Sequence, residues 1–92
     1  MAVGDITRDG APRVIGNLWL LTGTVEVDQD LTAFALGGRS AVSIKLTCED
    51  DSGVCRARIN ENASGTETLG TVALQSNLGI VNTFRYEYYF VM

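Results

Sequence analysis

The chain has no histidine among its 92 residues, and histidine is the side chain most often used in general acid–base catalysis. Without it, neither a Ser–His nor a Cys–His pair can activate a nucleophile. Two cysteines without histidine also fall short of the four ligands that a zinc site takes. A carboxylate pair for glycoside chemistry would need a cleft, for which a domain this small has little room. We therefore expect a protein that is not an enzyme, with no catalytic residue, cofactor or metal.

Charged residues are also scarce. They make up 20% of the chain, whereas 46% of the residues are hydrophobic. An average domain has roughly 25% charged residues. Because a small domain has much surface to cover, some apolar surface must stay exposed or be buried against other subunits. We expect the second arrangement, which predicts self-association.

The chain lacks the features of a nucleic-acid or membrane protein. Its net charge of −4 argues against a general nucleic-acid binder, since the neutralisation of phosphates needs a basic surface. Its longest apolar run, residues 18–21, is far shorter than the ~20 residues of a membrane span. The first residues show neither the basic nor the apolar region of a secretory signal. We expect synthesis in a cytoplasm, no nucleic-acid partner and no membrane.

The end of the chain carries the clearest structural pattern. Five of the seven aromatic residues lie in the last twelve positions. Four of them alternate along the chain: Phe84, Tyr86, Tyr88 and Phe90. Alternate positions share one face of a β-strand, so this pattern predicts a strand with an aromatic face. On the opposite face we expect Arg85 and Glu87 to balance each other's charge.

The rest of the chain reads as short strands separated by turns every 8–12 residues. This pattern is typical of an all-β fold, and it predicts an antiparallel β-sandwich or small barrel of six to eight short strands. Residues 1–92 are expected to form this single domain. The segment 31–36 is ambiguous, because it reads either as one helical turn or as a short strand.

Two hairpins are predicted from turn signals. Asp9-Gly10 is a type I′ turn signal between residues 6–8 and 13–15, which predicts an N-terminal hairpin arm within residues 1–15. Pro12 lacks an N–H donor, which suits a sheet edge or a bulge. The second hairpin pairs the alternating segments 42–48 and 55–59 across the loop 50–53. Its register places Cys48 directly opposite Cys55.

This register leaves two roles open for the cysteines. Directly opposed residues that are not hydrogen-bonded have Cα atoms about 4.5 Å apart, close enough for a disulfide between Cys48 and Cys55. The alternative is a pair of reduced thiols that act as small core residues. A cytoplasm favours the thiols, whereas a particle that leaves the cell can oxidise. Either role is structural.

The same register gathers positive charge on the outward face of the second hairpin. Lys45 stands opposite Arg58, with Arg56 beside them, and like charges directly opposed are destabilising. The cluster therefore predicts an acidic counterpart on this chain or on a partner; the alternative is a solvated face. With two residues of the N-terminal arm, these residues form the candidate partner interface: Asp9, Arg13, Lys45, Arg56 and Arg58.

Several segments resemble small structural proteins of tailed bacteriophages, an all-β group that includes capsid decoration, or cement, proteins. The resemblance lies in residues 1–3, in Arg13-Val14-Ile15-Gly16-Asn17, in Leu21-Thr22-Gly23-Thr24-Val25 with an aspartate shortly after, and in the aromatic ending Phe84-Arg85-Tyr86. Residues 40–65 lie outside it, and it assigns no functional residue.

The resemblance implies a non-enzymatic virion protein on the outer capsid surface. Such a protein would bind the major capsid protein, bridge capsomers and self-associate as a homotrimer. The alternatives are a tail or head–tail connector component, or a carbohydrate-binding module of a receptor-binding apparatus. Trp19 offers a test of the last alternative, because a sugar stacked on it would shift its fluorescence.

Overall fold

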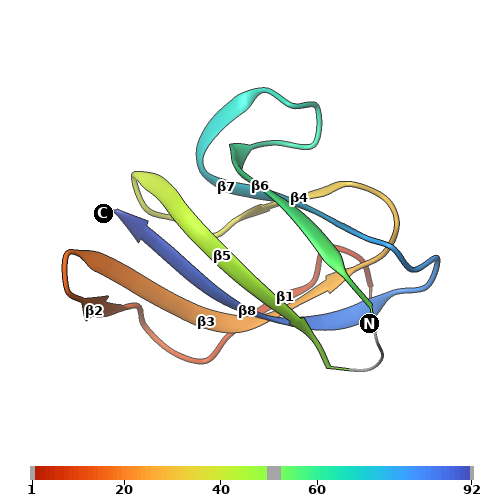
Figure 1. Cartoon of the computed structure of the whole chain (residues 1–92), viewed down its shortest axis with the longest axis horizontal. Helices are drawn as coiled ribbons and strands as arrows, with labels where there is room; N and C mark the ends of the chain where they lie inside the picture. The colour runs from red at the N-terminus through yellow and green to blue at the C-terminus, as the bar shows by residue number, and fades with distance from the viewer. Residues whose placement is uncertain (1, 50–52, 92) are drawn as a thin grey trace.

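The structure is a computed structural model that describes residues 2–49 and 53–91. Its strands form two antiparallel β-sheets (Figure 1). The strands are β1 (Ile6–Arg8), β2 (Arg13–Ile15), β3 (Leu18–Val27), β4 (Thr32–Ala35), β5 (Ser40–Cys48), β6 (Cys55–Glu61), β7 (Glu67–Ser76) and β8 (Asn82–Val91). Sheet A has the order β1-β3-β8-β5, with β2 also paired to β3, and sheet B has the order β4-β7-β6. The predicted all-β sandwich is confirmed, and the ambiguous segment 31–36 contains strand β4.

Strand β8 lies at the centre of sheet A, paired along its length with β3 and β5. Its alternating aromatic side chains all face the core and are at most 2% exposed: Phe84, Tyr86, Tyr88 and Phe90. The rings of Tyr88 and Phe90 stack with their centroids 5.1 Å apart. Sheet B covers this row with Phe34, Val72 and Leu74. The predicted aromatic face of the last strand is therefore confirmed, and it supplies the largest fully buried side chains of the core.

The two core tyrosines also hold neighbouring segments in place. The Tyr86 hydroxyl donates to the Thr7 carbonyl oxygen of β1 at 3.1 Å, and the Tyr88 hydroxyl donates to the Gly37 carbonyl oxygen at 2.8 Å. A buried hydroxyl needs such a partner to offset the loss of water. Burial also raises the pKa of both hydroxyls.

The predicted N-terminal hairpin arm is wrong. Strands β1 and β2 do not pair with each other; both pair with the same edge of β3, Ile6 opposite Val25 and Arg13 opposite Leu20. The Asp9 N–H donates to the Thr22 carbonyl oxygen at 2.9 Å, so the chain continues along β3 instead of reversing at Asp9-Gly10. This segment is an edge of sheet A, as Pro12 suggested.

The predicted hairpin between residues 42–48 and 55–59 is also wrong. Strand β5 pairs with β8 in sheet A, where Leu46 lies opposite Tyr86. Strand β6 pairs with β7 in sheet B, where Ala57 lies opposite Leu74. The chain therefore crosses from one sheet to the other between these strands. Alternation specifies which face of each strand is buried, but it does not specify the neighbouring strand. Strand β8 is a longer and more apolar partner for β5 than β6 is, and β7 is a longer and more deeply buried partner for β6 than β5 is.

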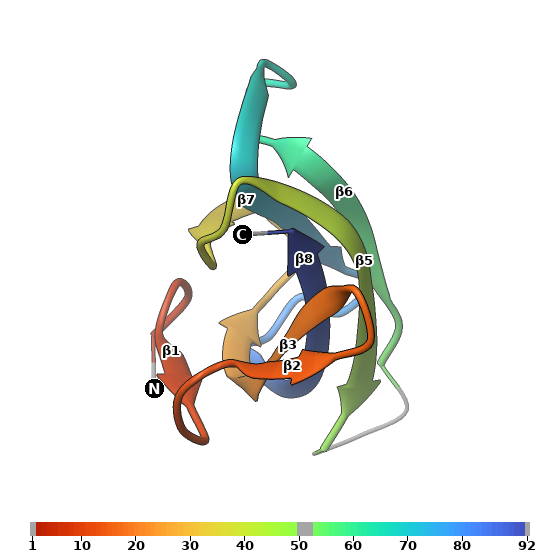
Figure 2. The ribbon, with the colours of Figure 1, turned by 90° about the vertical axis from the view of Figure 1, so that its left-hand side faces the viewer.

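The edges of β5 and β6 nevertheless lie side by side, as Figure 2 shows. Asn60 joins them from a register shift in β6 between Ile59 and Glu61. Its side-chain oxygen accepts from the Ala41 N–H at 2.8 Å, and its Nδ2 donates to the Ala41 carbonyl oxygen at 3.0 Å. The φ angle of Asn60 is +59°, a left-handed conformation that asparagine tolerates better than most residues.

The long axis of the molecule runs between the two ends of sheet A, within overall dimensions of 37 × 27 × 18 Å. In Figure 1 the turn at residues 16–17 and the end of β8 lie at the left. The loops 28–31 and 77–81 lie at the right. These two ends carry different side chains, which matters for how copies of the chain can meet.

Candidate functional site

The outer face of sheet A carries a charged hollow of about 510 Å³. Its centre is a row of directly opposed residues on three strands, Thr22, Glu87 and Lys45. Arg85 lies in the next row, between Thr24 and Thr47. Because directly opposed residues share a face, the register alone places these side chains on the surface away from the aromatic core.

Arg85 makes two of the ion pairs in this hollow. Its Nη1 lies 2.7 Å from Asp9 Oδ2, and its Nε lies 3.9 Å from Glu49 Oε1. Thr22 Oγ1 also donates to Asp9 Oδ2, at 2.9 Å. The Thr22 hydrogen bond, followed by that from Arg85, lowers the pKa of the Asp9 carboxyl below its ordinary value. Asp9 therefore keeps its negative charge in mildly acidic solution.

A third ion pair, between Lys45 Nζ and Glu87 Oε1 at 3.9 Å, lies beside these two. The predicted pairing of Arg85 with Glu87 is therefore wrong: Arg85 pairs with Asp9 and Glu49, and Glu87 pairs with Lys45. All of these side chains are at least two-fifths exposed. Exposed pairs of this kind add little to stability, because water and salt screen them. The hollow is therefore an exposed surface on which two cations pair with three carboxylates.

The five residues of the candidate partner interface do not form one cluster. Asp9 and Lys45 both line the charged hollow, and Arg13 lines a smaller neighbouring hollow of about 300 Å³ together with Asp9. Arg56 and Arg58 lie on sheet B instead. The predicted opposition of Lys45 and Arg58 is wrong, because their strands belong to different sheets; Lys45 lies opposite Glu87.

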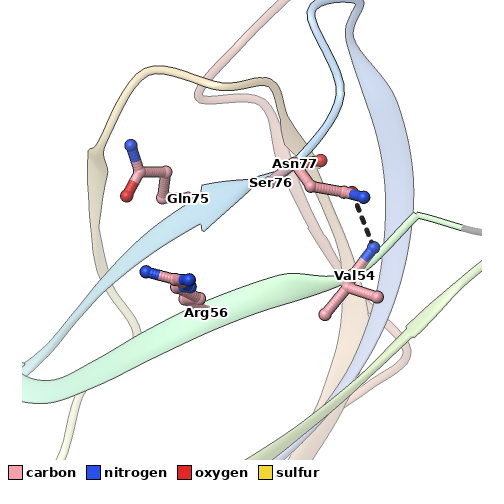
Figure 3. Close-up of a pocket in the computed structure, with 5 residues that line it drawn as sticks. All are labelled: Val54, Arg56, Gln75, Ser76 and Asn77. Atoms are coloured by element: carbon pink, nitrogen blue, oxygen red, sulfur yellow. Dashed lines mark hydrogen bonds between the residues drawn. The ribbon is translucent and has the colours of Figure 1, made fainter.

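Arg56 and Arg58 are exposed on the outer face of sheet B. Arg56 borders a hollow of about 320 Å³ near Gln75 and Asn77, shown in Figure 3. Arg58 lies opposite Ala73, which leaves its long side chain uncovered. Among the described residues, neither arginine has an ion-pair partner. These two guanidinium groups are therefore available to carboxylates from outside the chain.

The cysteines are free thiols, both half-buried against the core. Cys48 lies opposite Phe84 in sheet A and Cys55 lies opposite Ser76 in sheet B, so the predicted direct opposition of the two cysteines is wrong. Burial raises the pKa of the Cys55 thiol to about 11. The structure thus has the second of the two predicted arrangements, a pair of small core residues.

Two absences among the described residues bear on the candidate chemistry. Residues 2–49 and 53–91 hold no group of three or more His, Cys, Asp or Glu side chains that could bind a metal ion. In the same part of the chain, no helix is long and apolar enough to cross a membrane.

Comparisons of this chain with protein-family models, with curated proteins and with solved structures give no significant match. The structure presents a set of surfaces: a charged hollow on sheet A, exposed apolar side chains, and an arginine pair on sheet B that has no ion-pair partner among the described residues. Sequence reasoning placed Arg85 on this face but missed its partner Asp9, which lies 76 positions away along the chain. No local pattern signals a contact over that separation.

Proposed function

We propose that this chain is a non-enzymatic structural protein of a tailed-phage virion, most specifically a capsid decoration protein. It binds the major capsid protein on the outer surface of the head and stabilises the shell by bridging neighbouring capsomers. It is made in the host cytoplasm, and its copies associate with each other as a homotrimer. The resemblance in the sequence supplies the setting, and the surface of the molecule supports the binding role.

The observation that carries this proposal is the number of large hydrophobic side chains left in contact with water. Within residues 2–49 and 53–91, seven of them are at least 37% exposed: Val14, Ile15, Val42, Val54, Leu69, Ile80 and Val91. The chain has enough apolar residues to fill its core and still leaves these outside. Exposed apolar groups that gather in patches mark protein interfaces. A decoration protein buries such surface against its shell and against its own copies.

In this proposal the arginine pair of sheet B contacts the capsid. Arg56 and Arg58 are two positions apart on one strand, so they project on the same side about 7 Å apart. Each guanidinium can hold a carboxylate with two parallel hydrogen bonds. The pair therefore fits an acidic strip on the capsid surface. Lys45 is a weaker candidate, because Glu87 already balances its charge.

Co-sedimentation with heads of the encoding phage, stripped of decoration proteins, tests this function. The wild-type chain should bind at a fixed, saturable ratio. Reversal of the arginine pair (R56E/R58E) should weaken binding at least about tenfold, because desolvated interfacial charges would lose their partners. The matched control is K45E, a charge reversal on the other sheet, which should bind within about twofold of wild type.

Other outcomes of this experiment identify the alternatives. A chain that binds purified tails but not heads would be a tail or connector component, and the decoration proposal would be wrong. A chain that binds neither, but whose Trp19 emission shifts with glycans, would be a carbohydrate-binding module. Trp19 is suited to report this, because it is only half-buried and lies opposite the exposed Val14.

A further inference from the structure

One end of sheet A is apolar and basic. Strand β2 exposes Val14 and Ile15, at 59% and 48%, and Val91 at the end of β8 is 37% exposed. Arg13 follows on β2 and is exposed. On the other side, the Arg39 N–H donates to the Val91 carbonyl oxygen at 2.7 Å, which places exposed Arg39 beside this patch. We call this surface the basic end.

The opposite end is apolar and acidic. Ile80 and Val54 are the most exposed of the seven large hydrophobic side chains, at 67% and 63%. The loop that carries Asp28 and Asp30 lies beside them, because the Ser76 N–H donates to the Asp28 carbonyl oxygen at 2.8 Å. Asp30 is exposed and Asp28 is half-buried. We call this surface the acidic end.

The two ends lie apart along the 37 Å axis of the molecule. Figure 1 shows the turn of the basic end at the left and the loops of the acidic end at the right. The charged groups of each end have no ion-pair partner among the described residues: Arg13, Arg39, Asp28 and Asp30. Each end therefore matches the other in both respects, with an apolar centre and opposite charge beside it.

We propose that copies of this chain bind head to tail, with the basic end of one copy against the acidic end of the next. This inference rests on the self-association included in the proposed function and names the surfaces that produce it. A two-fold contact between like ends would bring arginine against arginine, which disfavours it. A head-to-tail contact instead closes into a ring or continues as a filament. Three elongated copies that meet end to end close into a triangle, in agreement with a homotrimer.

Charge reversal at each end, with absolute mass measured by light scattering at micromolar concentration, tests this inference. The wild-type chain should have the mass of three copies of the 9.9 kDa chain. Both R13E/R39E and D28K/D30K should lower the mass to that of one copy, because each places like charges against each other. The fourfold variant R13E/R39E/D28K/D30K restores opposite charges and should restore the trimer. The matched control is R58E, a reversal on sheet B, which should leave the mass unchanged.

The fold of each variant is checked by its circular dichroism and thermal unfolding. The Asp28 side chain stabilises its own turn, because its Oδ1 accepts a hydrogen bond from the Asp30 N–H at 2.9 Å. The variant D28K/D30K can therefore lose its fold, and in that case a substitute variant takes its place in the test. That substitute is I80D, which places a charge in the apolar centre of the acidic end and should also give monomers.

Three results would overturn the inference: a monomeric wild-type chain, a trimer that survives R13E/R39E, or a fourfold variant that stays monomeric. None of them depends on the capsid. A monomer that still binds heads would overturn head-to-tail association and leave the decoration function standing. A trimer that dissociates on charge reversal but binds no heads would support head-to-tail association and overturn the decoration function.

Discussion

The side chain of Asn60 bonds both backbone groups of Ala41, and in this way it joins the edges of the two sheets. The same side-chain oxygen also accepts from the Gly70 N–H at 3.2 Å. The amide group takes the place of a peptide group of a neighbouring strand where β5 itself is irregular, between Ala41 and Ser43. One side chain therefore closes the seam between sheets A and B on this side of the sandwich.

Replacement of Asn60 by alanine should lower the free energy of unfolding by about 3–4 kcal/mol. The change removes the bonds to Ala41 and leaves alanine in a left-handed conformation, at about 1 kcal/mol for each bond and 1–2 kcal/mol for the backbone. Urea denaturation followed by circular dichroism measures this. N60G removes the same bonds without the backbone strain, so it should cost less than N60A. Equal stability of N60A and wild type would show that the seam does not depend on this side chain.

The fold leaves no room for a side chain at Gly23. A Cβ atom there would lie 2.0 Å from the Thr7 carbonyl oxygen and 2.8 Å from the Tyr86 hydroxyl. Since the obstacle is backbone, G23A should destabilise the protein by about 1–3 kcal/mol or more. The control is G10A, where a Cβ would meet nothing within 4 Å. Thermal unfolding of both variants checks the prediction; a G23A protein as stable as G10A would contradict it.

The protein should lose stability in alkaline solution. Burial raises the pKa of Cys55 from 9.0 to about 11, and it also raises the pKa of Tyr86 and Tyr88 above 10. Raised values favour the neutral groups in the folded state. The contribution of Cys55 is therefore full below pH 9 and is lost as pH rises through 11, whereas those of Tyr86 and Tyr88 are full below pH 10 and are lost as pH rises through their raised pKa values. Melting temperatures measured from pH 8 to pH 11 should therefore fall. C55A should have a smaller fall over the first part of this range, and an identical curve would exclude Cys55 as the cause.

The two cysteines should be free in the purified protein. Two thiols per chain should react with a thiol reagent after unfolding, and a reducing agent should leave the melting temperature unchanged. If a disulfide between Cys48 and Cys55 stabilised the fold, its reduction would typically cost 2–5 kcal/mol and lower the melting temperature clearly. The comparison of melts with and without reductant decides between the two states.

The sequence predicted the class of fold because alternation is a local property. The aromatic row of β8 faces the core as its pattern indicates, and so do Ile44, Leu46 and Cys48 of β5 and Cys55 and Ile59 of β6. Val42 is exposed instead, at the register shift of β5 between Ala41 and Ser43. The partners of these strands were not predictable in the same way. Both predicted hairpins joined strands that are adjacent in sequence and well matched in pattern, yet neither pairing forms. Strands β2 and β6 pair with the strand that follows them, whereas β1 pairs with β3 and β5 pairs with the distant β8. Pattern and turn residues specify a face, whereas the competition among all available strands decides the pairing.

The candidate surfaces were predictable only in part. Exposed, charged side chains were recognised correctly as lying outside the core, including Arg56 and Arg58. Their grouping with Lys45 failed because it depended on the wrong strand pairing. The charged hollow and the two oppositely charged ends are assembled from segments far apart in the chain, so only the three-dimensional arrangement brings them together.

The most direct test of the account is electron cryomicroscopy of the encoding phage's virion. The account predicts density for this β-sandwich on the outer surface of the head, in groups of three copies joined end to end over the boundaries between capsomers. The arginine pair of sheet B should face the shell. Density for the chain in the tail alone, or a virion that lacks the chain, would contradict the proposed function.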